Sequence, residues 1–242
     1  MLSKGDFIMT SEQINTIFTL MIGYIPPTLK LFFFTLLYAI PFGMIVALLK
    51  MCRIKPVSWL TNLYILVMRG TPLLLQIIVV YYSVPILRTS SHCPAFLSSL
   101  FNRVEIQDEG YMFHMILLAF VLNYAAYFAE IFRGGIESIP KGQYEAAAAL
   151  GFNRFQSFFR IILPQVFKRV IPASSNEIIT LVKDTSLAYA MGYMEIMYIA
   201  KKQMSFYSSL VPLFIAGLFY FVAATLLTLF FAFIEKKLSY YK

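Results

Sequence analysis

The chain has 242 residues, of which 60% are hydrophobic and only 13% are charged, and its mean hydropathy is +0.73. This composition excludes an ordinary soluble domain and indicates a membrane protein that crosses the bilayer several times. The formal net charge of +8 does not indicate a nucleic-acid partner, because the basic residues flank apolar segments instead of forming one patch. We therefore expect an all-α membrane protein with a single transmembrane domain over residues 1–242.

The first periodic segment has the pattern of a helix that lies on a membrane surface. Residues 11–24 place Ile14, Phe18 and Met21 at helical spacing and polar side chains elsewhere. We expect an amphipathic interfacial helix here, ended by two consecutive prolines. A loosely ordered tail is the alternative.

Five later stretches are the expected transmembrane helices, since about 20 residues cross a hydrocarbon core of about 30 Å. They are Thr28–Leu49, Ser58–Ile86, Tyr111–Phe132, Val170–Met194 and Ser208–Phe233. The second stretch is longer than one crossing needs, and the sequence from Arg69 to Pro72 predicts a kink within it.

The distribution of Lys and Arg predicts the orientation. Basic residues are more frequent after the first stretch, in the central loop and at the C-terminus than on the opposite side. Since this bias marks the cytoplasmic side, we expect the N-terminus outside and the C-terminus inside. The loop Leu87–Gly110 then lies outside; its adjacent His92 and Cys93 do not supply enough ligands for a metal site.

The most polar part of the second half is Glu145–Gln165, which reads EAAAALGFNRFQSFFRIILPQ. Gln143–Leu150 is rich in alanine and predicts a helix, which Gly151 stops in a left-handed conformation. Phe152–Leu163 predicts a second helix, bounded by Pro164. We expect residues 140–163 to form a cytoplasmic hairpin whose small and aromatic face docks into a groove on another protein.

The spacing of this segment resembles the EAA motif of the transmembrane permease subunits of ABC importers. Met68–Gln76 (MRGTPLLLQ) and Ala129–Gln143 (AEIFRGGIESIPKGQ) resemble the polar amino-acid uptake branch of that family, which includes histidine, glutamine and arginine permeases. The resemblance covers roughly Pro26 to Lys237 and implies the MetI-like permease fold. It also implies a coupling helix that contacts an ATPase subunit, with the contact residues Glu145, Ala146, Ala147, Gly151, Arg154 and Pro164.

Further partners follow from the same resemblance. Two ATP-binding subunits, a second permease subunit that is identical or homologous, and a periplasmic or lipid-anchored solute-binding protein complete such an importer in the bacterial inner membrane. The chain has no phosphate-binding loop of the form G-x-x-x-x-G-K-[ST]. ATP and Mg²⁺ therefore belong to the partner ATPase, and we expect no cofactor in this chain and no enzymatic activity of its own.

The fourth stretch is polar for a membrane span. Charged groups at the bilayer centre cost about 2.5–3.5 kcal/mol each, so they usually face a cavity or one another. Glu177 and Asp184 are seven residues apart, or about two helical turns, and share a face with Thr180. We expect this face to line the translocation path, with substrate-binding residues Asn176, Glu177, Thr180, Lys183 and Asp184.

Each of these groups has a role in that hypothesis. The carboxylates attract the ammonium or guanidinium group of an amino acid, and Lys183 receives the substrate carboxylate or neutralises Asp184. The alternative is an internal network that only packs a subunit interface.

The favoured function is ATP-driven import of a polar amino acid, with basic amino acids preferred and glutamine, glutamate and cystine still open. One alternative is a stand-alone secondary transporter or channel that uses the Glu177/Asp184 helix. A second is an intramembrane enzyme, but carboxylates two turns apart are about 10 Å from each other along the axis, which is far for joint acid–base chemistry. A neighbouring gene for an ATPase would separate the first function from both alternatives.

Overall fold

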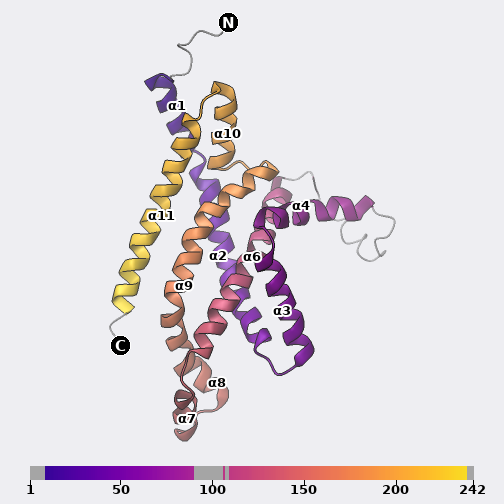
Figure 1. Cartoon of the computed structure of the whole chain (residues 1–242), viewed down its shortest axis with the longest axis vertical. Helices are drawn as coiled ribbons and strands as arrows, with labels where there is room; N and C mark the ends of the chain where they lie inside the picture. Colours follow the sequence, from indigo (N-terminus) through magenta and orange to yellow (C-terminus); the bar gives the residue numbers. More distant parts are fainter. Residues whose placement is uncertain (1–8, 90–105, 107–108, 239–242) are drawn as a thin grey trace. The chain divides into compact units, whose positions relative to one another are not determined.

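A computed structural model describes residues 9–89, 106 and 109–238, and every regular element in this part of the chain is helical (Figure 1). The helices are α1 (Ser11–Ile22), α2 (Ile25–Lys50), α3 (Lys55–Gly70), α4 (Leu73–Thr89), α6 (Glu109–Glu137), α7 (Lys141–Ala149), α8 (Arg154–Ser157), α9 (Leu163–Asp184), α10 (Ile196–Tyr207) and α11 (Val211–Leu238). A π-helical turn, η1 (Phe158–Ile162), precedes α9, and a 3₁₀ segment, η2 (Thr185–Met191), follows it. The all-α prediction is confirmed, whereas His92 and Cys93 of the predicted outer loop lie outside the described residues.

Three of the described helical segments are long and apolar enough to cross a membrane: Ser11–Lys50, Gly110–Glu137 and Val211–Leu238. A fourth is added if α3 and α4, which are separated by a break at Thr71–Pro72, count as one broken span. The break confirms the predicted interruption after Arg69. Helix α9 is not in this set, so the count of five spans remains a prediction.

The chain divides into two compact units. The first contains Met1–Thr35, Pro72–Phe120 and Thr180–Leu226, and the second contains Leu36–Thr71, Val121–Ile179 and Leu227–Lys242. The chain passes between the units within α2, α6, α9 and α11 and at the break between α3 and α4.

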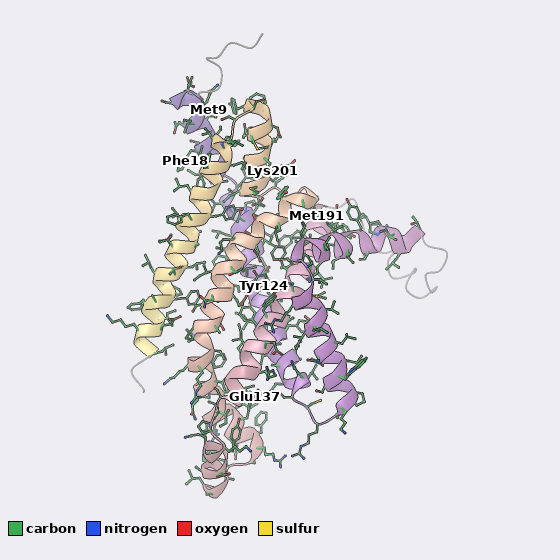
Figure 2. The ribbon with its side chains drawn as sticks, in the orientation of Figure 1. Met9, Phe18, Tyr124, Glu137, Met191 and Lys201 are labelled. Carbon is green, nitrogen blue, oxygen red and sulfur yellow. The ribbon has the colours of Figure 1, made fainter. Side chains whose placement is uncertain are left out.

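In the first unit, α1, α10 and the start of α11 pack on a shared apolar core (Figure 1). Helix α1 contributes only Ile17 and Met21 as buried residues, and Phe18 stacks on Phe219 of α11 with ring centroids 5.1 Å apart (Figure 2). Thr10 and Gln13 form a capping box that starts the helix. The predicted amphipathic helix over residues 11–24 is thus a helix at Ser11–Ile22, and its interfacial position remains a prediction.

In the second unit, a polar residue inside α6 supplies a hydrogen-bond donor at the break after α3. Pro72 has no N–H, so the carbonyl of Met68, four residues earlier, loses its usual helical donor. The Nδ2 of Asn123 donates to that carbonyl at 2.9 Å. One helical turn away, Tyr64 donates to the carbonyl of Leu122 at 2.6 Å. These bonds explain why an amide side chain stands in the middle of an apolar helix.

Candidate functional site

The predicted hairpin is found in the second unit, and its turn has the expected chemistry. Gly151 has φ +80°, so α7 ends in the left-handed conformation predicted from the sequence. The N–H of Gly151 donates to the carbonyl of Ala148 at 3.0 Å, and the N–H of Phe152 donates to that of Ala147 at 3.1 Å. These two bonds form a Schellman motif, which satisfies carbonyls that the end of a helix leaves without donors.

The second helix of the hairpin begins later than the sequence predicted. It starts at Arg154 instead of Phe152, because Asn153 is its N-cap. The Oδ1 of Asn153 accepts from the N–H of Gln156 at 2.8 Å, and the Oε1 of Gln156 accepts from the N–H of Asn153 at 3.1 Å. This capping box is readable in the sequence as Asn followed three residues later by Gln, a signal that the sequence analysis did not use.

The prediction that Pro164 bounds this helix is wrong. The chain stays helical from Arg154 to Asp184, and Pro164 lies at the start of α9. The π-helical turn directly before it, in which the N–H of Leu163 donates to the carbonyl of Phe158, inserts an extra residue and accommodates the proline ring. The side chain of Gln165 donates to the carbonyl of Ile161 at 2.9 Å and to the Oε1 of Gln143 at 3.2 Å, which ties α9 to α7.

The hairpin presents an apolar surface. Leu150 is 75% exposed and Phe155 is 70% exposed, while Tyr144 and Phe159 are also exposed. The rings of Phe155 and Phe159 lie 4.4 Å apart by their centroids. Helices α7 and α8 lie side by side (Figure 1). We call this surface, formed by Tyr144, Leu150, Phe155 and Phe159, the hairpin face.

The predicted coupling residues lie in the hairpin and at the start of α9. Glu145, Ala146, Gly151, Arg154 and Pro164 are exposed, whereas Ala147 is buried against the rest of the hairpin. The motif therefore contains one buried packing residue, Ala147, and five exposed residues that a partner protein could contact. Phe155 and Phe159 belong to the aromatic face that the sequence analysis expected to dock, whereas Leu150, the most exposed residue of the hairpin face, was not predicted.

The predicted substrate residues all lie on α9, and they occupy its open side. Asn176, Thr180 and Lys183 are exposed, and Glu177 and Asp184 are half-buried. The opposite side of the helix buries Ser175, Ile178, Leu181 and Val182. Helix α9 is thus amphipathic, with its apolar side packed inside the chain and its polar side exposed or half-buried.

A cluster of charges in the second unit was not predicted. Glu130 of α6 accepts from Lys50 of α2 at 2.6 Å and from Arg133 at 2.9 Å. Arg133 also pairs at 2.6 Å with Glu137, which Figure 2 labels. Arg69 lies 4.0 Å from Glu130. The spacing of Glu130, Arg133 and Glu137 fits one helix face and could have indicated the pair interactions, but the partner from α2 could not be found from spacing.

A second unpredicted group is Glu195, which caps the first turn of α10 in the first unit. Its carboxylate accepts from the N–H groups of Met197 and Tyr198 at 2.9 and 2.8 Å and from the hydroxyl of Tyr220 at 2.5 Å. The side chain is fully buried. Burial raises the pKa of Glu195 from 4.5 to about 7, although the three donated hydrogen bonds oppose the shift.

Among the described residues, no group of three or more His, Cys, Asp or Glu side chains is placed to hold a metal ion. What the described part of the chain offers is a polar helix face in a largely apolar bundle and an exposed hairpin. These features are compatible with a membrane protein that binds a separate subunit through its hairpin.

The chain belongs to the family of binding-protein-dependent transport system inner membrane components, whose pattern it matches over residues 39–240. This family consists of permease subunits of ABC importers, in which ATP hydrolysis belongs to a separate subunit. The predicted family, the location in the inner membrane and the absence of an enzymatic role for this subunit are thereby confirmed.

Curated relatives support the same assignment. The arginine transport system permease protein ArtQ of Bacillus subtilis is 35% identical over 235 residues, which cover 97% of each chain. The octopine transport system permease protein OccM of Rhizobium radiobacter is 39% identical over 220 residues, covering 88% of this chain and 84% of the relative. The L-cystine transport system permease protein TcyL of Bacillus subtilis is 31% identical and covers 97% and 90%.

Solved structures confirm the fold. A crystal structure of an amino acid ABC transporter with histidines matches 96% of this chain and 100% of its own, with a TM-score of 0.80 and 28% identity. An inward-facing structure of the MetNI methionine ABC transporter matches 95% and 99%, with a TM-score of 0.67 and 16% identity, which supports the MetI-like fold alone.

Proposed function

We propose that this chain is the permease subunit of a bacterial ATP-driven importer of polar amino acids. The relatives named above are permeases for arginine, octopine and cystine, and their shared substrate class is an amino acid or its derivative. The observation that carries the proposal is the exposed hairpin, because its hairpin face is a docking surface for a separate motor. A stand-alone secondary transporter or channel has no need of such a surface.

The hairpin is the site at which the ATPase subunit drives the pore. Binding of ATP shifts the pore only if it favours one pore state over the other, so the contact must transmit force. The Schellman turn at Gly151 and the bond from Gln165 to Gln143 hold the hairpin as one body. Closure of two ATPases then moves two such hairpins together and opens the path by a rigid-body change.

The open side of α9 forms half of the translocation path, and a second permease subunit supplies the other half. Exposed polar groups on a membrane helix are costly unless they face water or a partner. In this arrangement Glu177 and Asp184 attract the cationic group of the substrate, and Lys183 binds its carboxylate. These carboxylates favour a basic amino acid over a neutral one.

The remaining parts of the importer follow from the family. A solute-binding protein delivers the amino acid on the outer side, and ATP with Mg²⁺ is bound by the ATPase subunits. The chain crosses the membrane five times with its N-terminus outside, its C-terminus inside and the hairpin in the cytoplasm.

The test is uptake into proteoliposomes that contain this permease, its cognate ATPase and its solute-binding protein. Labelled arginine, lysine, histidine, glutamine, glutamate and cystine are compared with ATP or with a non-hydrolysable analogue inside. We expect uptake of a basic amino acid that requires hydrolysis. Uptake by the permease alone, driven by an ion gradient, would establish the secondary-transporter alternative instead.

A further inference from the structure

A cavity of about 490 Å³ opens in the second unit, and none of its lining residues belongs to the hairpin or to α9. It lies where the end of α2 meets the start of α3 and the last turns of α6. The lining residues that matter here are Lys50, Lys55, Trp59, Asn62, Arg133 and Glu137.

The cavity carries an excess of positive charge. Lys50 and Arg133 are balanced by Glu130 and Glu137, to which they bond at 2.6 to 2.9 Å. The exposed Lys55 lies outside this network and is the third cation of the lining. Lys55 is also the first residue of α3, so the positive end of the helix dipole adds to its charge. An anionic group is the ligand that this charge distribution favours.

The rim of the cavity continues into an apolar stripe. Trp59 is 65% exposed, and Leu63 and Leu66, four and seven residues further along α3, are exposed on the same face of the helix. Tryptophan with adjacent lysine is the residue pair typical of the boundary between headgroups and hydrocarbon. A ligand that fits both features has an anionic head and a long apolar tail.

We propose that this cavity binds the headgroup of an anionic phospholipid, with one acyl chain lying along the Trp59–Leu66 stripe. The phosphate accepts from Lys55, and the amide of Asn62 bonds the glycerol part of the headgroup. A volume of about 490 Å³ is in the range of sites that hold small molecules. Free phosphate shares the chemistry of the headgroup but would make no use of the apolar stripe, so a lipid is the ligand that the observations favour.

The chain offers a direct probe, because Trp59 is its single tryptophan. The full-length permease is reconstituted in nanodiscs of phosphatidylcholine, and brominated phosphatidylglycerol or brominated phosphatidylcholine is added at equal mole fractions. Bromine quenches tryptophan emission only at close range. We expect phosphatidylglycerol to quench Trp59 at a several-fold lower mole fraction than phosphatidylcholine does.

Two substitutions test whether the headgroup binds at Lys55. Lys55→Gln removes the cation outside the Glu130 network and leaves the ion pairs of the fold intact. It should weaken the preference for phosphatidylglycerol about fivefold, the effect of one lysine near an anionic membrane surface. Lys141→Gln is the matched control, because Lys141 is exposed on α7 and does not line the cavity. It should leave the preference unchanged.

Three results would overturn the proposal. Equal quenching by the two brominated lipids would show that the cavity does not select an anionic headgroup. Equal loss in Lys55→Gln and Lys141→Gln would place the selectivity outside the cavity. Reversal of the quenching by millimolar inorganic phosphate, but not by potassium chloride at equal ionic strength, would identify a site for soluble phosphate.

Discussion

A single residue, Gly151, determines the turn of the hairpin. Its φ of +80° is a conformation that residues with a side chain rarely adopt, and its N–H donates to the carbonyl of Ala148. Proline at this position has a fixed φ near −65° and no N–H, so it is incompatible with the turn in both respects.

We therefore expect Gly151→Pro to reduce ATP-dependent uptake tenfold or more, while the protein still inserts in the membrane. Uptake in proteoliposomes and the amount of inserted permease are measured together. Gly142→Ala is the control, since Gly142 is helical and a methyl group there meets nothing within 4 Å. Normal uptake by Gly151→Pro would show that the turn has no part in coupling.

Glu195 makes stability depend on pH. Its pKa is raised to about 7 in the folded protein, above the ordinary value of 4.5, so the folded state binds the proton more tightly than the unfolded state. The resulting stability, about 3 kcal/mol at most, is fully present below pH 4.5 and is lost as the pH rises through 7.

The measurement is the midpoint of thermal unfolding of the purified permease between pH 5 and pH 8. The midpoint should fall over this range in the natural protein and change less in Glu195→Gln, which cannot ionise. An equal slope in both proteins would assign the pH dependence to other groups.

At the scale of single residues, the sequence predicted the features that depend only on residues close by in the chain. The left-handed stop at Gly151 follows from a glycine after an alanine helix, and it was found as expected. The role of Glu195 could not be read, because its partner Tyr220 is 25 residues away and meets it only in the fold. The bond from Asn123 to Met68 likewise joins residues 55 positions apart, so it depends on tertiary packing.

At the scale of one element, α6 and α9 of the second unit approach closely at Gly135. A Cβ atom at this position would lie 2.3 Å from Cγ1 of Val170 and 3.2 Å from Cγ1 of Val166. Such contacts are shorter than side chains tolerate, so helix packing must shift to admit even a methyl group.

The neighbouring glycine supplies a matched control. Gly135→Ala should destabilise the permease by about 1–3 kcal/mol, the usual cost of overpacking a core. Gly134→Ala should be neutral or stabilising, because nothing lies within 4 Å and alanine favours a helix by up to about 1 kcal/mol. Thermal unfolding of both variants in the same detergent makes the comparison. Equal midpoints would contradict the close contact with Val170.

Helix α9 carries the proposed substrate specificity. Glu177→Gln and Asp184→Asn keep the size of the side chains and remove one negative charge each. In the proposed path they should raise the KM for arginine and lysine by about tenfold or more, since one charge-assisted hydrogen bond contributes about 1.5–3 kcal/mol. Glutamine uptake should change much less. If uptake of every amino acid is unchanged, the two carboxylates serve packing alone.

The boundaries of the elements show where sequence reasoning stops. The hairpin was predicted as two helices around a glycine, and it has that form. The predicted end at Pro164 was wrong because the chain continues as a helix through the proline, directly after a π-helical turn. Helix propensity alone does not contain this information.

At the scale of the whole molecule, the sequence carried the family and fold class, because motif spacing and hydrophobicity are properties of the chain. The number of transmembrane spans did not follow from the sequence as directly. Helix α9 has too many polar residues for a hydropathy criterion, yet its open polar side is what a pore between two subunits requires. In the proposed pore a second permease subunit covers this side, and such a partner cannot be read from one chain alone.

The orientation of the chain is therefore the decisive property at this scale. The bias of Lys and Arg predicts that α1 lies on the outer side and the hairpin on the cytoplasmic side. In a variant without native cysteines, Asn15→Cys on α1 and Ala149→Cys on α7 each place one thiol at an exposed position.

A maleimide that does not cross membranes should label Asn15→Cys in right-side-out vesicles and Ala149→Cys only in inside-out vesicles, with at least a tenfold preference in each case. Labelling of both from the same side would require an even number of crossings between these two positions. Reversed labelling would place the hairpin outside the cell, where no ATP-driven subunit could reach it, and would remove the mechanical basis of the proposed function.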